Sequence, residues 1–593
     1  MSAHEDETLG KAYDSRLMKR LLVFLRPFRQ WVILAIAVLI IGSLIELAGP
    51  YLIRIAIDDY ISQGDLSGLK VIALFYLGML LLQAVINFSQ TWLTQKIGQH
   101  VMYDLRTKIF SHLQRLPLAY FDRNPVGRLV TRTTNDVETL NNMLSSGVVT
   151  VFGDVFVLVG IVIAMLLFHW RLALLTLVVL PLVFLTSYLF RTHIRDSFRD
   201  VRTRIAAINS YLQENIAGMS TVQLFSREAK NFSHFDRLNV AYLQAYLRTI
   251  FYYAVFYPVI ELIMSVSIAL ILWYGGLQVV DKTLTLGILV AFLQYVQRFF
   301  MPIRDLSEKF NLLQSAMAAS ERIFAVFDTP VSMLRPADSV LPAAAKGEIV
   351  FQNVSFGYQP DNLVLKNLNL TIRPGEKVAV VGATGAGKTS LINLIPRMYE
   401  PTSGTIYLDG VDTQRVSLTE LRQRVRMVLQ DVFIFSGTVE YNIRLGNEEI
   451  SMERVIQAAR DVHADEFIQK LPQGYQTELT ERGGNLSVGQ KQLLSFARAL
   501  CFNPEILILD EATSSVDTET ELFIRDAIRK LMHGRTSIII AHRLSTIQDA
   551  DWILVLHKGE IREMGSHAEL LSQRGIYYRL YQLQYDLEPQ EVY

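Results

Sequence analysis

A glycine-rich segment that ends in lysine and threonine carries the residue types best suited to chemistry. In KVAVVGATGAGKTS, an apolar strand at 378–381 precedes the pattern G-x-x-x-x-G-K-[ST], and a helix-forming stretch follows it. Glycines let backbone N–H groups surround a β-phosphate, Lys388 neutralises phosphate oxygens, and the Thr389 hydroxyl ligates Mg²⁺. The alternative to a phosphate-binding loop is a chance glycine-rich turn. A chance turn would not need a strand before it and a helix after it, so the phosphate-binding loop is favoured. The nucleotide-binding residues predicted here are Gly382, Thr384, Gly385, Ala386, Gly387, Lys388, Thr389 and Ser390.

Two neighbouring carboxylates, Asp510 and Glu511, end the buried-strand run ILILD and follow it directly. Sheets of this kind bind ligands at the carboxyl ends of their strands. We therefore expect Asp510 to hold Mg²⁺, partly through water, and Glu511 to polarise the water that attacks the γ-phosphate. The alternative is that both acids only cap the next helix. Because the chain also has a phosphate-binding loop, we favour the interpretation that both acids belong to one ATP-hydrolysing site over the interpretation that they only cap a helix.

These groups lie in the C-terminal part of the chain, where short β-branched strands alternate with helical stretches. The N-terminal part instead contains apolar runs that are long enough to cross a bilayer. The predicted spans are 31–57, 71–92, 147–168, 172–190, 251–280 and 284–301. Only residues 169–171 separate the third span from the fourth, which predicts a tight turn there. We predict a membrane α-helical bundle of six transmembrane helices fused to an α/β P-loop NTPase domain. The predicted boundaries are 1–327 for the bundle, 328–347 for a linker and 348–593 for the ATP-binding domain.

Lysine and arginine residues indicate which side of the membrane is cytoplasmic. They are frequent before the first span and after the second, whereas the loop 62–70 between these spans contains almost none. We expect a multi-pass protein of the inner (cytoplasmic) membrane with the lipid bilayer as a partner and the ATP-binding domain in the cytoplasm. Basic and acidic residues number 57 each, so no overall charge favours nucleic acid as a partner.

The C-terminal part resembles the ABC ATPases. LSVGQ, at 486–490, precedes ILILDEA as that family's signature does, and it opens a helix whose N-terminus suits a γ-phosphate. The resemblance implies that the signature binds ATP held by an opposing subunit. It also implies that Tyr358 stacks on adenine. The other residues it implicates are Ser487, Gly489, Gln490 and Asp517 for nucleotide binding, Gln430 and His542 for catalysis, and Gln430 for Mg²⁺. Each of these matches is weak alone, because such residues are more often packing or surface groups.

The paired spans and their long intracellular extensions resemble the type IV exporters, and this resemblance covers essentially the whole chain. It implies a dimer with a second half-transporter subunit. Two ATP molecules would close the ATPase dimer, and the cavity would reopen outward before hydrolysis resets it. The segments 118–127 and 211–225 would dock on the ATPase domain as coupling helices.

Val488 departs from the family pattern, which usually has glycine at this signature position. A β-branched residue at the start of the helix restricts the backbone and its approach to phosphate. The alternative is that the valine points away without effect. The chain's own hydrolytic residues match the pattern. A complete set of hydrolytic residues together with an altered signature resembles the family members that pair with a different subunit, so a heterodimer is favoured over a homodimer.

The transported substrate is expected to be apolar or amphipathic, drug-like or lipid. Glu46 and Glu261 lie inside predicted spans and would suit a cationic amphipathic substrate, but hydrogen bonding between helices is the favoured interpretation. Within the same class, a lipid flippase or a peptide exporter is open. From another class, an ATP-gated channel or a regulatory membrane ATPase is the main alternative, since the ATPase motifs specify hydrolysis and not pumping.

Overall fold

A computed structural model of the chain describes residues 14–331, 341–342, 346–359, 361–510, 518–540 and 547–585. Its contacts divide the chain into two units. The first comprises Met1–Gln114 and Gly127–Asp328, and the second comprises Arg115–Val126 and Thr329–Tyr593. The segment Arg115–Val126 therefore belongs by its contacts to the C-terminal unit, although most of its sequence neighbours belong to the first.

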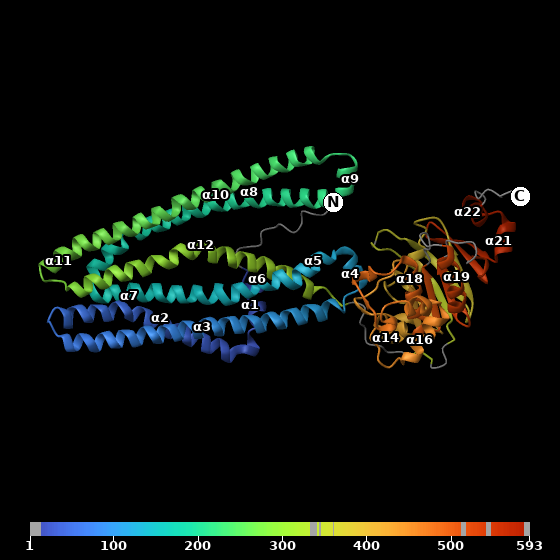
Figure 1. The fold of residues 1–593 in the computed structure, drawn as a ribbon, viewed down its shortest axis with the longest axis horizontal. Coiled ribbons are helices and arrows are strands. Elements are labelled where there is room, and N and C mark those ends of the chain that lie inside the picture. The colour runs from blue at the N-terminus through green and yellow to red at the C-terminus, as the bar shows by residue number, and fades with distance from the viewer. Residues whose placement is uncertain are drawn as a thin grey trace. The chain divides into compact units, whose positions relative to one another are not determined.

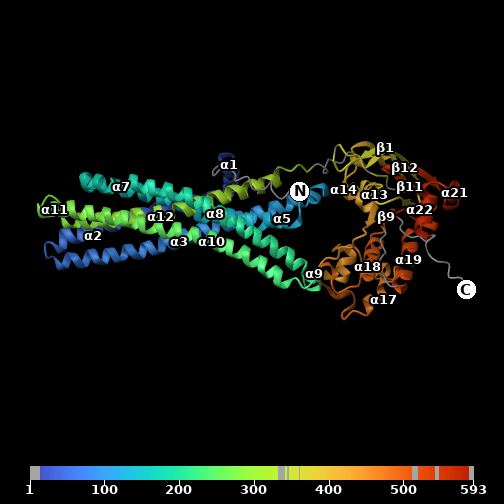
Figure 2. The ribbon, with the colours of Figure 1, turned by 90° about the horizontal axis from the view of Figure 1, so that it is seen from above.

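All the regular secondary structure in the described part of the first unit is helical, and its long helices run alongside one another (Figures 1 and 2). α8 and α10 form a long hairpin closed by α9 (Figure 1). The helices are α1 (Ser15–Val23), α2 (Arg29–Ile55), α3 (Leu66–Leu113), α5 (Val126–Thr131), α6 (Val137–Asn142), α7 (Val149–Leu177), α8 (Leu180–Ala217), α9 (Met219–Leu224), α10 (Glu228–Leu270), α11 (Gly276–Val280) and α12 (Leu286–Asp328). Short helical turns join them: η2 (Arg26–Phe28), η3 (Ala56–Ile61), η4 (Arg132–Asp136), η5 (Met143–Val148) and η6 (Ile271–Gly275).

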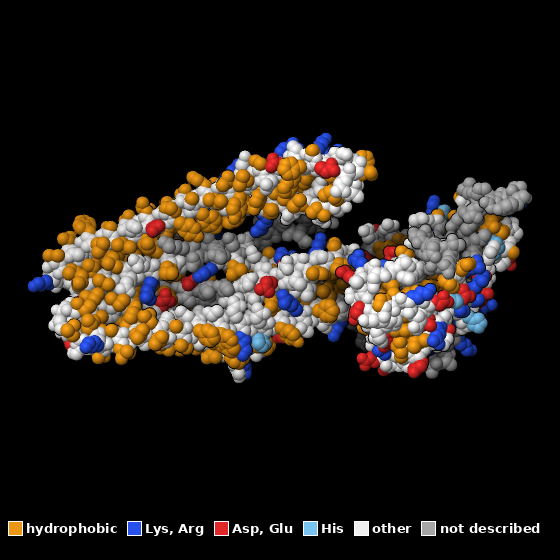
Figure 3. Space-filling model, viewed as in Figure 1, with side chains coloured by type: hydrophobic (Ala, Val, Ile, Leu, Met, Phe, Trp, Pro, Cys, Tyr) orange, Lys and Arg blue, Asp and Glu red, His pale blue; other side chains and the backbone are white. Residues whose placement is uncertain are grey.

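The membrane-spanning character of this unit is visible in its surface. Among the described residues, four helical segments are long and apolar enough to cross a bilayer: Arg26–Ile61, Leu66–Leu113, Val151–Leu177 and Glu228–Val280. The apolar helix Leu286–Pro302 is shorter. Hydrophobic side chains spread along the exposed faces of these helices (Figure 3). This exposure is expected where lipid, and not water, covers the helix.

The predicted turn at 169–171, between the third and fourth spans, is a kink within one helical element. His169 leaves helical geometry, and its Nδ1 accepts a hydrogen bond of 3.2 Å from the backbone N–H of Leu172, as a capping residue would. The fourth predicted span, 172–190, is therefore divided between the end of α7 and the start of α8. Six spans are consistent with this arrangement.

Polar side chains within the predicted spans are used mainly for contacts inside the protein. Pro50 lacks the N–H that would bond to the carbonyl of Glu46, and the guanidinium of Arg298 on α12 donates to that carbonyl instead. Tyr295 donates to the carbonyl of Leu47 at 2.8 Å. These contacts tie α12 to α2 around Pro50. The role of the Glu46 and Glu261 carboxylates stays a prediction.

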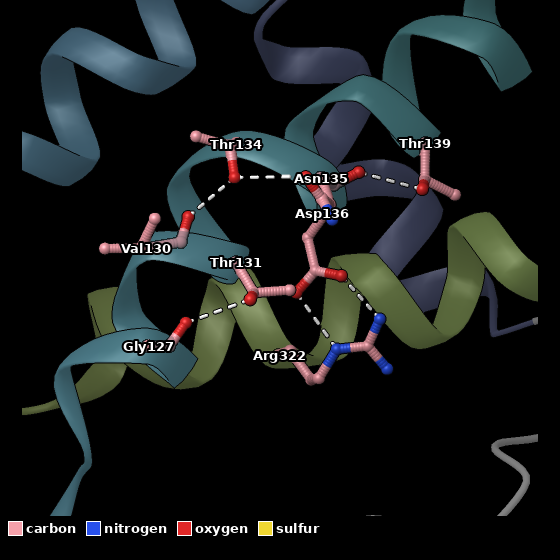
Figure 4. A network of polar contacts seen from close by, with 8 residues as sticks. All are labelled: Gly127, Val130, Thr131, Thr134, Asn135, Asp136, Thr139 and Arg322. Atoms are coloured by element: carbon pink, nitrogen blue, oxygen red, sulfur yellow. Dashed lines mark hydrogen bonds and ion pairs between the residues drawn. The ribbon is translucent and has the colours of Figure 1, made fainter. Parts of the chain in front are cut away.

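Two ion pairs join α12 to α7 and to η4. Lys309 pairs with Asp154 on α7. Arg322 forms a two-pronged pair with Asp136, with contacts of 3.0 Å from Nε and 2.6 Å from Nη2 (Figure 4). The side chain of Asp136 is almost fully buried. Because an unpaired buried carboxylate is costly, Arg322 stabilises this part of the unit.

The second unit contains two main sheets. One has the strand order β2-β1-β4-β5 and is antiparallel, and the other has the order β12-β11-β3-β10-β9-β6. The strands are β1 (Ile349–Phe356), β2 (Leu365–Ile372), β3 (Lys377–Val381), β4 (Ser403–Leu408), β5 (Val411–Asp412), β6 (Val425–Val428), β9 (Ile506–Asp510), β10 (Thr536–Ile540), β11 (Trp552–His557) and β12 (Glu560–Gly565). β7 (Gly437–Thr438) pairs with β8 (Glu478–Leu479).

Helices cover the six-stranded sheet. Alternate residues of β9 enter two different cores: Leu507 and Leu509 join one cluster, whereas Ile506 and Ile508 join the other. Both faces of this strand are thus buried, as the predicted α/β architecture requires. The helices of the unit are α4 (Leu118–Arg123), α13 (Lys388–Leu394), α14 (Leu418–Arg424), α15 (Val439–Arg444), α16 (Met452–Asp461), α17 (Ala464–Gln469), α18 (Val488–Cys501), α19 (Thr518–Met532), α21 (His567–Gln573) and α22 (Ile576–Tyr585), with the short turns η7 (Thr413–Arg415), η8 (Gly474–Gln476) and η9 (Glu481–Gly483).

α4 is the part of Arg115–Val126 that contacts this unit. Tyr399 donates to the Asp122 carboxylate at 2.5 Å, and Arg123 donates to the backbone carbonyl of Tyr358 at 3.1 Å. Ala119 packs against the core cluster that includes β1 and β2. The predicted docking of 118–127 is therefore confirmed. The second predicted docking segment, 211–225, lies in the first unit, and its docking stays a prediction.

Candidate ATP-binding site

Four neighbouring parallel strands bring the predicted site residues to one edge of the sheet. β10 pairs in parallel with both β3 and β9, and β6 pairs in parallel with β9. Their carboxyl ends therefore face the same way. The phosphate-binding loop follows β3, Asp510 ends β9, and Gln430 follows β6. Ligands bind at this edge in sheets of this kind.

The loop Gly382–Gly387 connects β3 to α13 as its sequence predicts. Gly387 has φ +105°, and a Cβ there would lie 2.7 Å from Leu365 Cδ2, so conformation and space both require glycine. The Lys388 ammonium donates to the carbonyls of Gly382 at 2.7 Å and Ala383 at 3.2 Å. Burial lowers the pKa of Lys388, while the charge of Asp510 opposes that shift. The ammonium is thus held over the loop where a phosphate would bind.

The other predicted nucleotide-binding residues of this segment lie on either side of Lys388 in the sequence. Thr384, Gly385 and Thr389 are exposed, whereas Ala386 and Ser390 are buried. Thr389 and Asp510 offer oxygen atoms at the same edge, and oxygen is the donor that Mg²⁺ prefers. Among the described residues, no group of three or more His, Cys, Asp or Glu side chains could hold a metal ion. This donor set fits an ion that keeps water and phosphate oxygens as most of its ligands.

Three predicted site residues, Glu511, Asp517 and His542, lie outside the described residues. The strands that lead to two of them are described. Glu511 directly follows Asp510 at the end of β9, and His542 comes two residues after Ile540, which ends β10. Their roles stay predictions.

Tyr358 lies beside the phosphate-binding loop. Its hydroxyl is 3.0 Å from Ser390 Oγ, and its ring meets Tyr399 edge-on at a centroid distance of 5.2 Å. The side chain remains 43% exposed, which leaves ring surface for a ligand. The predicted stacking of adenine on this ring stays a proposal.

The signature segment opens α18 with a capping box. Ser487 Oγ accepts from the backbone N–H of Gln490 at 3.2 Å, and Gln490 Oε1 accepts from the N–H of Ser487 at 2.9 Å. Gly489 is buried. The side chain of Val488 is 59% exposed at the first position of the helix. Val488 is thus exposed on the segment that, by the resemblance, would contact ATP held by an opposing subunit.

Arg498 in α18 is a positioning residue that the sequence interpretation missed. It donates from Nε to the carbonyl of Asn442 at 2.9 Å and from Nη1 to the carbonyl of Phe433 at 3.1 Å. Burial lowers its pKa to about 10. Arg498 therefore fixes the segment after Gln430 to the signature helix. The available signal was one arginine in an otherwise apolar stretch of helix, SFARAL.

Known families match both parts of the chain. The ABC transporter transmembrane region matches residues 32–303, and the ABC transporter model matches residues 365–514. The ABC transporter ATP-binding protein YknV of Bacillus subtilis is 39% identical over 98% of this chain and 96% of its own length. A fatty acid ABC transporter ATP-binding/permease protein of Mycobacterium bovis is 41% identical over 85% of this chain and 80% of its own.

This chain belongs to the ABC transporters. A solved bacterial Atm1-family ABC exporter with ATP bound has a TM-score of 0.77 and 28% identity, with coverage of 94% of this chain and 98% of that one. The predicted resemblance to ABC exporter half-transporters is confirmed. The chain is a multi-pass protein of the cytoplasmic membrane whose cytoplasmic ATPase domain binds ATP. As an ABC exporter half-transporter, it works in a dimer and couples ATP hydrolysis to export.

Proposed function

We propose that this half-transporter exports an amphipathic or apolar small molecule, lipid or drug-like, from the cytoplasmic side of the membrane. The proposal rests on the match to the ABC exporters and, on this chain, on an open surface hollow of ≈ 400 Å³ along one face of α10. Its lining combines polar and aromatic groups: Gln244, Leu247, Arg248, Phe251 and Tyr252. Such a lining suits a molecule with one polar end and one apolar end. The fatty acid transporter among the relatives supports a lipid substrate.

The ATP site is proposed to work as the sequence predicts. Lys388 and the loop amides hold the β- and γ-phosphates, and Thr389, Gln430 and Asp510 contribute to Mg²⁺ binding. Bound Mg²⁺ would neutralise charge on the phosphates. Glu511 would polarise the attacking water, and His542 would contact the γ-phosphate side of the site. Tyr358 would stack on adenine.

The partner is proposed to be a different half-transporter subunit. Val488 supports this, because its exposed, β-branched side chain occupies a helix start that a γ-phosphate would approach. Ser487, Gly489, Gln490 and Asp517 would contribute to the site held by that partner. If the purified chain alone hydrolyses ATP and responds strongly to amphipathic drugs, it functions as a homodimer and this part of the proposal fails.

The first experiment compares the ATPase activity of wild type with that of Glu511→Gln, both reconstituted in lipid vesicles, with and without amphipathic candidates. The proposal predicts that the mutant retains nucleotide but does not turn it over. Accumulation of substrate against its gradient, driven by ATP, would support a pump. Flux that only dissipates a gradient would instead support an ATP-gated channel.

A further inference from the structure

A lysine lies between two tryptophans on the surface of the first unit. The Lys96 ammonium on α3 is 4.2 Å from the ring centroid of Trp31 on α2 and 4.5 Å from that of Trp92 on α3. The two indole rings meet edge-on at a centroid distance of 6.5 Å. Both tryptophans are exposed, at 40% and 49%. These contacts fix the position of the ammonium through attraction to the ring faces.

Two more contacts, one between two rings and one between a lysine and a ring, continue toward the N-terminus of the chain. Phe28 meets the ring of His100 edge-on at 5.5 Å, and the Lys108 ammonium lies 4.8 Å from the ring of Phe24. Lys96 and His100 are one helical turn apart on α3, and Lys108 lies two turns further along the helix, beyond Asp104. We call Lys96, His100 and Lys108 with their aromatic partners the basic–aromatic row.

α1 is fixed beside this row with apolar side chains left exposed. Arg20 forms two hydrogen bonds of 2.8 Å with the Asp328 carboxylate, and Leu21 is fully buried. This fixed orientation leaves Leu22 and Val23 exposed, at 46% and 49%. A short helix with exposed apolar residues and nearby positive charge is typical of one that lies in a membrane interface.

The ends of the apolar runs indicate how deep in the membrane the row lies. Trp31 begins the first run and Trp92 ends the second, and both ends are on the cytoplasmic side. Among the residues that the structure describes, Lys96 and Lys108 form no ion pair, and neither do the exposed Arg26 and Arg29. Lys96, one helical turn beyond Trp92, together with Arg26 and Arg29, therefore places positive charge at the level of the inner-leaflet headgroups, whereas Asp104 and Lys108 lie further along α3.

We propose that the basic–aromatic row is a binding surface for anionic phospholipid headgroups of the inner leaflet, with Lys96 as its central phosphate contact. The two indoles hold the ammonium at headgroup depth, where a tryptophan belt also sits in membrane proteins. Attraction between basic side chains and anionic lipid supplies the affinity. Leu22 and Val23 insert beside the headgroups. This surface uses none of the residues of the ATP site or of the hollow on α10, and it does not depend on which substrate is exported.

The test measures which lipid contacts these tryptophans. The full chain, with Trp170→Phe and Trp273→Phe to remove the exposed tryptophans at the opposite end of the spans, is placed in vesicles of phosphatidylcholine and phosphatidylglycerol without ATP. Only one of the two lipids carries bromine in each sample. We expect brominated phosphatidylglycerol to quench the fluorescence more strongly than brominated phosphatidylcholine at equal content. Lys96→Gln should reduce this preference by about fivefold.

Two matched variants separate charge at this place from charge in general. Lys96→Arg keeps both the charge and the contact with the rings, so it should retain the preference. Lys70→Gln removes an exposed lysine near the outer end of the same helix and should leave the preference unchanged. An unaltered preference in Lys96→Gln, or an equal loss in Lys70→Gln, would overturn the proposal. Because no ATP or substrate is present, failure to observe export would not affect this result.

Discussion

The contact between α4 and the ATPase unit yields a prediction with a definite magnitude. Tyr399→Phe removes the hydroxyl that donates to Asp122 at 2.5 Å and keeps the ring. Hydrogen bonds to charged groups contribute about 1.5–3 kcal/mol. Asp122 is exposed and water can solvate it once the hydroxyl is gone, so the lower limit applies. A loss of about 1.5 kcal/mol raises the opening constant of the docked segment about tenfold.

Hydrogen exchange measures this opening directly. A helix of this length is not stable on its own, so α4 should lose its structure whenever it undocks. The amide of Asn124, which bonds to the carbonyl of Tyr120 at 3.1 Å, reports on that event. We expect the peptide covering 115–126 to exchange about tenfold faster in Tyr399→Phe, in the full-length protein in lipid.

Tyr407→Phe is the matched control. Tyr407 is half-buried on β4 in the same unit, and among the described contacts its hydroxyl forms no hydrogen bond. Its loss should leave the exchange of 115–126 unchanged. If Tyr399→Phe exchanges at the wild-type rate, or if Tyr407→Phe accelerates exchange as much, the reasoning about the Asp122 contact is refuted.

Three further changes test other parts of the structure. Arg322→Met leaves the buried Asp136 without its main partner and should destabilise the membrane unit by about 3–5 kcal/mol, whereas adding Asp136→Leu should recover much of the loss in thermal-unfolding assays. Val488→Gly should raise the ATPase rate of the chain alone if the valine hinders phosphate, and an unchanged rate would mean that it does not. Burial lowers the pKa of His567 in the folded protein. The unfolded chain therefore binds more protons below about pH 6.5, and stability falls as the pH drops. His567→Gln should make the melting temperature of the ATPase unit depend less on pH between about pH 7 and 5.

The features that the sequence could predict are those determined by local pattern. The phosphate-binding loop needs a strand, glycines and a lysine in fixed order, and the structure places Lys388 over that loop. Apolar runs of sufficient length likewise indicated the membrane spans. The break at His169 lies at the predicted turn, but apolar patterns did not indicate that the His169 side chain itself would cap the next helix.

Contacts between distant residues could not be predicted from pattern. Arg498 and Phe433 are far apart in sequence, and nothing local indicates that the guanidinium of one binds the carbonyl of the other. The same holds for Arg298, which bonds to a carbonyl that Pro50 leaves free. In both cases the sequence shows a charged residue in an apolar helix, but its partner is known only once the chain has folded.

A continuous set of contacts connects α4 to the phosphate-binding loop within the second unit. Asp122 accepts from Tyr399, the ring of Tyr399 meets that of Tyr358, and the Tyr358 hydroxyl lies 3.0 Å from Ser390, two residues after Lys388. Arg123 adds a second contact to Tyr358 through its carbonyl. If Tyr358 stacks on adenine as proposed, a bound nucleotide orders the ring against which α4 is docked. By linkage, a variant that loosens this docking must also weaken nucleotide binding, whereas a variant elsewhere on the ATPase surface need not.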